Sequence, residues 1–274
     1  MTIFEFIAIT MDKNSVVKKI NQHKKQPNLR FELKEKVETF TNLLFYTLFD
    51  IDTAVEKNLD KLESQFDGLV DLACWDVEKS CKKLWESYVE KLPEILKRLN
   101  LDAEATVNCD PASLSIEEVY MAYPGFYAIA IYRLAHELYL DGFPLVPRLM
   151  TEYAHRQTGV DINPGARIGN SFHIDHGTGV VIGETAIIKN KVKIYQGVTL
   201  GGLYVAKNLQ KTKRHPTIEN NVTIYANATI LGGDTVIGEN SVIGGNAWLT
   251  SSVPPNSTVF HTPEIKIKTL PHVS

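Results

Sequence analysis

Single aliphatic residues recur every six positions through the C-terminal part of the chain, a period that fits neither an α-helix nor an ordinary β-strand. A small or β-branched residue often stands four positions after each of them. A period this short is typical of a parallel β-solenoid, in which each coil stacks on the last and turns one aliphatic side chain per six residues into the core. The thirteen positions in this register are Ile162, Ile168, Ile174, Ile182, Ile188, Ile194, Leu200, Ile218, Ile224, Ile230, Ile237, Ile243 and Leu249.

The preceding part of the chain follows a helical pattern instead. Apolar residues there are spaced by three and four positions, as at Val55, Leu59, Leu62, Phe66, Leu69 and Ala73. Such spacing places apolar side chains on one face of a helix. We therefore expect a two-domain α+β chain, with an all-α domain that covers the first solenoid coil. The expected divisions are a loosely packed segment 1–32, helices at 33–158, the solenoid at 159–260 and a tail at 261–274.

Composition excludes several classes of protein. The 274 residues include 29 Lys and Arg against 32 Asp and Glu, a net charge of -3 that argues against a dedicated nucleic-acid binder. No apolar run reaches the roughly 18–20 residues of a membrane span. The first ten residues lack the basic start of a signal peptide, which predicts a cytoplasmic protein, with Met11 as an alternative translation start. Three cysteines are too few for a disulfide framework, so we expect Cys74 and Cys81 to be buried free thiols.

The repeat is first interrupted between Ile174 and Ile182, which are eight rather than six positions apart. The two extra residues fall in the segment Ile-Asp-His-Gly-Thr-Gly, so we expect Asp175 and His176 at a bulged corner. A lone histidine is most often structural or solvated. A bulged corner that holds an imidazole towards a cleft would suit it to acid–base chemistry near neutral pH.

A second interruption separates Gly201 from Pro216. The segment lacks large aliphatic residues at the expected inward positions and contains Lys207, Lys211, Lys213 and Arg214. It predicts an extruded basic loop at 203–213. Such a loop is either simply solvated or binds a phosphate-bearing cofactor through its cations.

At these interruptions the sequence closely resembles the serine O-acetyltransferases, a family of hexapeptide-repeat enzymes. The resemblance covers roughly residues 108–255. The hexapeptides themselves are shared by many acyltransferases, whereas the combination of the other motifs is far more specific. These motifs are Asp110-Pro111-Ala112, Val160-Asp161-Ile162-Asn163-Pro164, Asp175-His176-Gly177-Thr178-Gly179, Gly183-Glu184-Thr185, Thr199-Leu200-Gly201-Gly202 and Arg214-His215-Pro216.

This resemblance implies a left-handed parallel β-helix that assembles as a homotrimer, with active sites between neighbouring subunits and two trimers paired in many members. It also implies transfer of an acetyl group from acetyl-CoA to L-serine, which gives O-acetyl-L-serine and CoA in cysteine biosynthesis. No metal is implied.

The resemblance also implies residue roles. It makes His176 the general base and Asp161 the carboxylate that orients it. Asp110, Asp175, Arg214 and His215 match positions that hold serine, and Gly201, Gly202, Ala226 and Gly245 match the groove for the pantetheine arm. Because serine itself attacks the thioester, we expect direct transfer without an acyl-enzyme. Asp110 and Asp161 could instead only cap a helix or a turn.

The sequence departs from the family at two places. The loop before Arg214 is long, and Lys213 stands where an acidic residue is common. The chain ends His272-Val273-Ser274 rather than in isoleucine, so we do not expect a complex with O-acetylserine sulfhydrylase.

Three rival hypotheses fit the sequence less well. One is a related acetyltransferase that acts on another small hydroxyl or amine acceptor. Another is a zinc hydratase on the same solenoid, which would need a third histidine beside His173 and His176, and no further histidine lies on the next coil. The last is a non-catalytic assembly scaffold.

Overall fold

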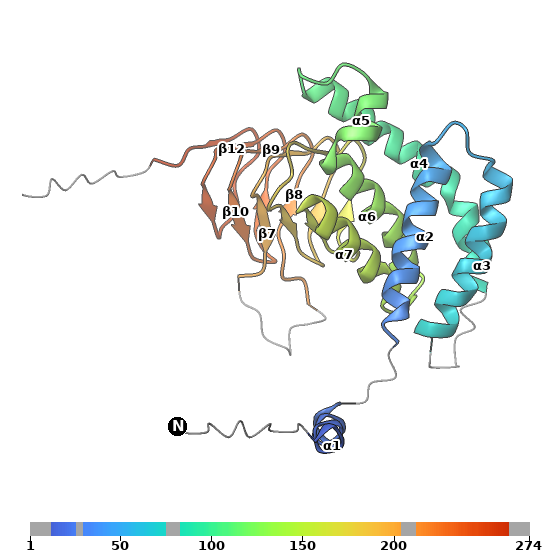
Figure 1. Ribbon diagram of the computed structural model, residues 1–274. Coiled ribbons are helices and arrows are strands. Elements are labelled where there is room, and N and C mark those ends of the chain that lie inside the picture. The colour runs from blue at the N-terminus through green and yellow to red at the C-terminus, as the bar shows by residue number, and fades with distance from the viewer. Residues whose placement is uncertain (1–11, 26–29, 75–82, 204–211, 263–274) are drawn as a thin grey trace, which may run out of the picture.

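The computed structural model describes residues 12–25, 30–74, 83–203 and 212–262 of the chain. A parallel β-solenoid forms the C-terminal part, and a group of α-helices packs against its first coil (Figure 1). The repeat and the helical periodicity therefore predicted both architectures correctly. The predicted loop core at 204–211 and the tail from 263 onward lie outside the described residues.

Three parallel sheets form the walls of the solenoid, because successive strands pass from one sheet to the next and return to the first after three strands. The first sheet contains β1 (Asp161–Ile162), β4 (Val181–Ile182), β7 (Thr199–Gly201), β10 (Thr229–Leu231) and β13 (Trp248–Leu249). The second contains β2 (Arg167–Ile168), β5 (Ile187–Ile188), β8 (Thr217–Ile218) and β11 (Val236–Ile237). The third contains β3 (His173–Ile174), β6 (Lys193–Ile194), β9 (Thr223–Ile224), β12 (Val242–Ile243) and β14 (Thr258–Val259).

The thirteen predicted aliphatic residues all lie on strands and form the solenoid core. All are buried except Leu249, which is half-buried. Small residues four positions later fill the space at the turns, and Ala166, Val198 and Ala228 are completely buried. The structure adds one strand that the repeat did not predict, β14, whose Val259 packs against the same core.

Seven helices precede the solenoid in the described part of the chain. The helical core contains buried residues of α2, α3, α4, α5, α6 and α7. Their bounds are α1 (Lys13–His23), α2 (Glu32–Phe49), α3 (Val55–Ala73), α4 (Leu84–Cys109), α5 (Ile116–Ala122), α6 (Pro124–Leu140) and α7 (Val146–Thr158).

Helix α6 covers the open end of the solenoid. Its Ala128, Ile129 and Tyr132 belong to the solenoid core rather than to the helical core. The helix approaches β3 so closely that a Cβ on Gly125 would lie 2.2 Å from the carbonyl oxygen of Ile174. Only glycine fits this contact. The helical segment thus covers the exposed first coil, as expected, and protects its unpaired strand edges.

A buried ion pair fastens the helices to the first coil. Arg133 on α6 donates to the Asp102 carboxylate on α4, with Nη2 2.8 Å from Oδ1, and also to the carbonyl oxygens of Ile168 and Gly169. Asp102 in turn accepts from the backbone N–H of Phe172 at 2.9 Å. Both charged side chains are almost fully buried, at 2% and 0% exposure.

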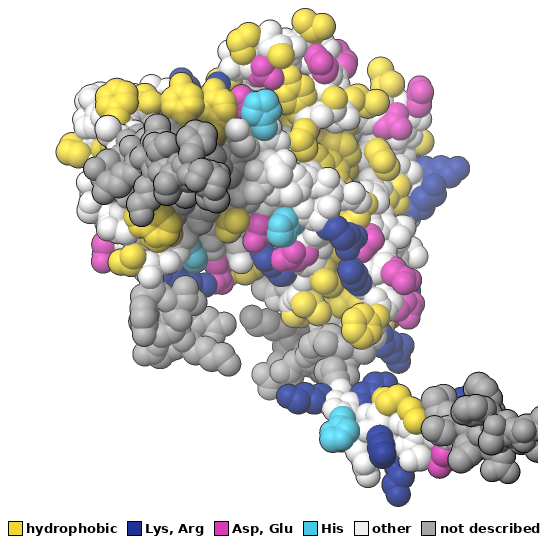
Figure 2. Space-filling model, turned by 60° about the vertical axis from the view of Figure 1, so that its left-hand side comes forward, with side chains coloured by type: hydrophobic (Ala, Val, Ile, Leu, Met, Phe, Trp, Pro, Cys, Tyr) yellow, Lys and Arg dark blue, Asp and Glu magenta, His cyan; other side chains and the backbone are white. Residues whose placement is uncertain are grey.

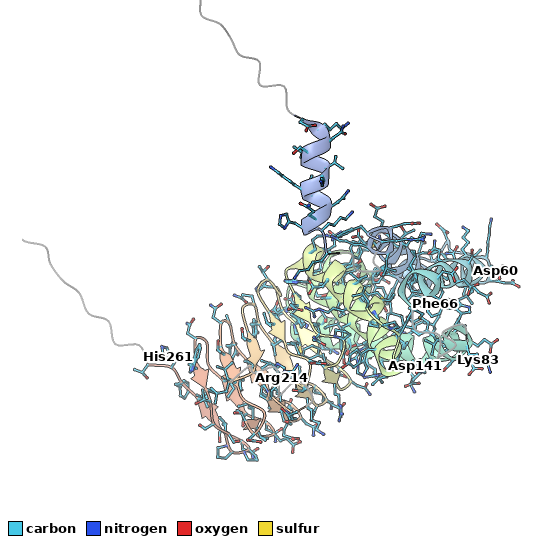
Figure 3. The ribbon with its side chains drawn as sticks, turned by 90° about the horizontal axis from the view of Figure 1, so that it is seen from below. Asp60, Phe66, Lys83, Asp141, Arg214 and His261 are labelled. Carbon is cyan, nitrogen blue, oxygen red and sulfur yellow. The ribbon has the colours of Figure 1, made fainter. Side chains whose placement is uncertain are left out.

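The N-terminal segment contains a helix that the sequence did not predict. Helix α1 buries none of its residues and extends away from the other helices (Figures 1 and 3). No helix in the described ranges combines the length and apolar character needed to cross a membrane.

Cys74 is disulfide-bonded, so the expectation of a free thiol there is wrong, whereas Cys109 is free. Cys81 lies outside the described residues.

Candidate active site

The first interruption of the repeat forms the predicted bulged turn between β3 and β4. His176 has a left-handed backbone conformation with φ 57°, which is uncommon outside glycine, and Gly177 and Gly179 follow with φ 91° and 81°. The turn leaves the His176 side chain 71% exposed. Its Nδ1 lies 3.9 Å from Oδ1 of Asp175, whose side chain is mostly buried.

Asp110 reaches the same turn from the end of α4. Its carboxylate accepts a hydrogen bond from the Tyr123 hydroxyl at 2.7 Å and another from the backbone N–H of Ala112 at 2.8 Å. These two bonds lower the pKa of Asp110, and the positive charges that His173 and His176 carry when protonated lower it further. The structure therefore places Asp110 within electrostatic range of the turn that carries Asp175 and the exposed His176.

Asp161 does not make the contact that the resemblance implied. Within the described residues no hydrogen bond joins it to His176, and its Oδ1 accepts instead from Nη1 of Arg148 on α7 at 3.2 Å. Arg148 also pairs with Glu152, which lies 3.2 Å from Nδ1 of His155. In the single chain, Asp161 is thus oriented by an arginine that the sequence analysis did not single out.

Arg214 and His215 lie at a different turn, before β8. Arg214 donates to the Glu184 carboxylate, and its backbone N–H donates to Oγ1 of Thr185. The N–H of Thr185 donates to Nδ1 of His215 at 3.1 Å, so the ring proton of His215 is on Nε2. The ring lies so close to Gly183 that a Cβ there would be 2.1 Å from it.

The predicted site residues therefore divide between two edges of the solenoid. We call the turns from the third sheet to the first the His176 corner, and the turns from the first sheet to the second the Arg214 corner. The strands of the first sheet run from one corner to the other, at the upper and lower edges of the solenoid in Figure 1. Within one chain the width of this sheet separates the imidazole from Arg214.

The residues expected to bind the cofactor divide in the same way. Ala226 and Gly245 stack on successive coils of the His176 corner, where a Cβ on Gly245 would lie 3.1 Å from the Ala226 oxygen. Gly201 ends β7 and Gly202 follows it, on the other side of the first sheet at the Arg214 corner. No single edge of the chain carries the complete set.

Three further side chains support the two corners. Lys193 on β6 donates to the carbonyl oxygen of Cys109 at 3.0 Å and so fixes the backbone beside Asp110. His173 is fully buried, with Nδ1 3.0 Å from Oγ1 of Thr106. Glu184 accepts from both Arg214 and the Tyr139 hydroxyl. No sequence signal distinguishes these partners, because each contact joins segments far apart in the chain.

Acid is expected to destabilise the fold through two buried histidines. Burial lowers the pKa of His173 and of His215 to about 4, and for His215 the nearby Arg214 charge adds to this effect. An unfolded histidine has a pKa near 6.5, so between pH 6.5 and 4 the unfolded chain binds protons that the folded chain does not. The free energy of unfolding should therefore fall as the pH drops through this window.

The measurement is urea unfolding at pH 7 and pH 4.5. Between these pH values the free energy of unfolding of the His173→Phe variant should fall by about 2–3 kcal/mol less than that of the unmodified chain. The variant lacks the proton that unfolding allows His173 to bind. An identical loss in both proteins would contradict this explanation.

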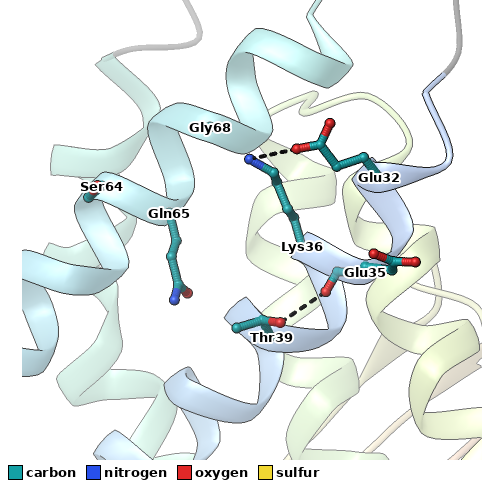
Figure 4. Close-up of a pocket in the computed structure, with 7 residues that line it drawn as sticks. All are labelled: Glu32, Glu35, Lys36, Thr39, Ser64, Gln65 and Gly68. Carbon is teal, nitrogen blue, oxygen red and sulfur yellow. Dashed lines mark hydrogen bonds and ion pairs between the residues drawn. The ribbon is translucent and has the colours of Figure 1, made fainter.

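The structure also contains a cluster of possible metal ligands and a cavity between two helices, and we assign a ligand to neither. Ligand atoms of Glu152, His155 and Asp161 lie within 4.8 Å of one another, but Arg148 already pairs with both carboxylates, so we assign no metal there. A cavity of about 510 Å³ between α2 and α3 contains none of the predicted site residues (Figure 4). Its lining is Glu32, Glu35, Lys36, Thr39, Ser64, Gln65 and Gly68.

Comparison with known proteins identifies the family. No protein-family model matches the chain. The plasmid serine acetyltransferase of Synechococcus elongatus is 48% identical over 188 residues, which cover 67% of this chain and 59% of that protein. The serine acetyltransferase of Helicobacter pylori is 46% identical over 124 residues, which cover 45% of this chain and 70% of that protein. This chain belongs to the serine acetyltransferase family.

Solved structures of this family share the fold. Serine acetyltransferase isoform 3 of Entamoeba histolytica, in complex with cysteine, gives a TM-score of 0.74 at 32% identity, with 94% of this chain and 93% of that chain covered. The Neisseria gonorrhoeae enzyme in complex with serine gives 0.60 at 28% identity, covering 91% and 87%. The Brucella abortus enzyme in complex with coenzyme A gives 0.62 at 27% identity, covering 91% and 85%. The match to the first curated relatives spans only 50–59% of their length.

Proposed function

We propose that this chain is a serine O-acetyltransferase that acts in the cytoplasm and transfers the acetyl group of acetyl-CoA to the hydroxyl of L-serine. The observation that carries the proposal is the placement of Asp110 within electrostatic range of the bulged turn that carries Asp175 and an exposed His176. Two carboxylates suit the ammonium group of an amino acid, and the imidazole suits proton removal from a hydroxyl. Family members solved with serine and with coenzyme A support the choice of substrates.

In the proposed reaction, His176 takes the proton of the serine hydroxyl as its oxygen attacks the thioester carbonyl. The tetrahedral intermediate then expels the CoA thiolate, which receives the proton from the imidazolium, so the products are O-acetyl-L-serine and CoA. No nucleophile of the enzyme takes part. Asp110 and Asp175 hold the serine ammonium group, and this positioning supplies part of the rate enhancement.

Asp161 fits the orienting role if its two carboxylate oxygens have different partners. Arg148 binds Oδ1, which leaves Oδ2 to accept from Nδ1 of His176. A carboxylate held in this way fixes the imidazole tautomer and stabilises the imidazolium that forms during the reaction. Arg148 is then a positioning residue that acts through Asp161.

The division of the site between two corners supports an assembled enzyme. We propose that the chain, a helical domain followed by a left-handed β-helix, forms a homotrimer in which the His176 corner of one subunit meets the Arg214 corner of its neighbour. Arg214 and His215 then bind the serine carboxylate from across the interface, and both glycine sets line one pantetheine groove. Trimers could pair further through their helices.

The experiment measures thiol release from acetyl-CoA with L-serine, other amino acids and hydroxyl-bearing sugars as acceptors, with mass spectrometry of the product. We expect release that depends on L-serine and yields O-acetyl-L-serine. Release with a different acceptor alone would support the alternative of another small hydroxyl or amine substrate. Release with none would refute the enzymatic proposal.

A further inference from the structure

An aromatic column runs along the His176 corner. The residues that follow the third-sheet strands lie one above another. The backbone N–H of each, as far as Gly244, donates to the carbonyl oxygen of the last strand residue on the next coil. In order along the solenoid they are Asp175, Tyr195, Tyr225, Gly244 and Phe260. Figure 2 shows hydrophobic side chains in a row along one edge of the molecule.

The first two rings of this column already stack. The centroids of Tyr195 and Tyr225 are 4.9 Å apart with 15° between the ring planes, and Nζ of Lys193 lies 5.0 Å from the Tyr195 centroid. The outer side of Tyr225 is open, since the residue is 44% exposed and the next position is Gly244. Stacking therefore ends at Tyr225 with one ring face uncovered.

Gly244 leaves a gap of the size of one ring. The column resumes at Phe260, which is 80% exposed and two coils beyond Tyr225. Two coils correspond to about 9.6 Å at the usual strand spacing. A planar group in contact with both rings needs about 7–8 Å, so it fits between them.

Glycine is required at this position. A Cβ on Gly244 would lie 2.8 Å from the carbonyl oxygen of Val259, and a larger side chain would also fill the gap between the rings. The gap is therefore built into the backbone packing of the last two coils.

The gap adjoins the expected cofactor groove. Ala226 and Gly245 directly follow Tyr225 and Gly244 in the chain, so the two columns run side by side. Three coils separate the level of His176 from that of Gly245, about 14 Å at the usual spacing. This distance is within reach of the extended chain that joins the thioester of acetyl-CoA to its adenine.

We propose that Tyr225 and Phe260 bind the adenine ring of acetyl-CoA between them, over Gly244. This inference rests on the proposed function, which supplies the ligand, and assigns a binding role to residues outside the motifs of the family. A stacked base accounts for the open ring face of Tyr225 and for the exposed Phe260.

The test compares acetyl-CoA with acetyl-pantetheine, which carries the same thioester without the nucleotide. In Tyr225→Leu and in Phe260→Leu the KM for acetyl-CoA should rise roughly tenfold, as expected for loss of one stacking face, while the KM for acetyl-pantetheine stays unchanged. Phe31→Leu, which alters another exposed aromatic residue at the start of α2, is the matched control and should change neither value.

An equal rise for both substrates, or no rise for acetyl-CoA, would overturn the proposal. The proposal would also be overturned if the variants lost AMP binding while their KM for acetyl-CoA stayed unchanged, because the gap would then bind a free nucleotide. Calorimetric binding of CoA separates this inference from the enzymatic one. Roughly tenfold weaker CoA binding in the two variants supports the stacking site even in a protein that acetylates no serine.

Discussion

Replacing His176 with asparagine is expected to lower serine-dependent acetyl transfer by roughly 10²–10⁴-fold, the usual contribution of a general base. Asparagine is the appropriate substitution because it tolerates the left-handed backbone conformation of this position, φ 57°, and offers no titratable nitrogen. The loss should appear mainly in kcat, because Asp110 and Asp175 still hold the amino acid.

The control for this prediction is stability. The His176 side chain is 71% exposed and, within the described part of the chain, its polar neighbour is Asp175 at 3.9 Å. Thermal unfolding of His176→Asn should therefore match that of the unmodified chain to within a few degrees. Activity within tenfold of the unmodified enzyme would show that another group removes the proton.

The Arg133→Met variant is expected to lose about 3–5 kcal/mol of the free energy of unfolding, because it leaves a buried carboxylate without its partner. Asp102 is fully buried, and burial raises its pKa while Arg133 opposes that shift. The substitution also removes the donors to Ile168 and Gly169, which join α6 to the first coil. Urea unfolding measures the loss.

A double variant separates the ion pair from the packing. Arg133→Met combined with Asp102→Leu removes both charges and keeps much of the buried volume, so it should be more stable than Arg133→Met alone. The N–H of Phe172 still loses its acceptor, so recovery should be incomplete. A cost below about 1 kcal/mol for the single variant would contradict a role for this pair in fastening the helices to the solenoid.

The repeat predicted the solenoid core because each inward position is marked in the sequence by an aliphatic residue at a regular spacing. Every aliphatic residue of the register, from Ile162 to Leu249, is the second residue of its strand. The eight-residue interval before Ile182 likewise predicted the bulge at His176. Patterns of this kind depend only on neighbours along the chain.

Contacts between separate helices and strands produce no such local pattern in the sequence. The sequence did not show that Arg148 would bind Asp161, that Tyr123 would bind Asp110, or that Arg133 would pair with Asp102. Each pair joins two different helices or strands, or the cap residues that flank them, and its geometry exists only after the domain packs. The Asp161–His176 bond implied by the resemblance is not formed in the single chain, where Asp161 binds Arg148 instead.

The central claim is that one active site combines the His176 corner of one subunit with the Arg214 corner of another. Mixed assembly of two inactive variants, His176→Asn and Arg214→Ala, tests it directly. In randomly mixed trimers about one quarter of the interfaces would unite an intact His176 with an intact Arg214, so roughly a quarter of the activity should return. A mixture of His176→Asn with Asp175→Asn, which both alter the same corner, should stay inactive. No recovery in the first mixture, after assembly of mixed trimers is verified by mass, would contradict the shared site.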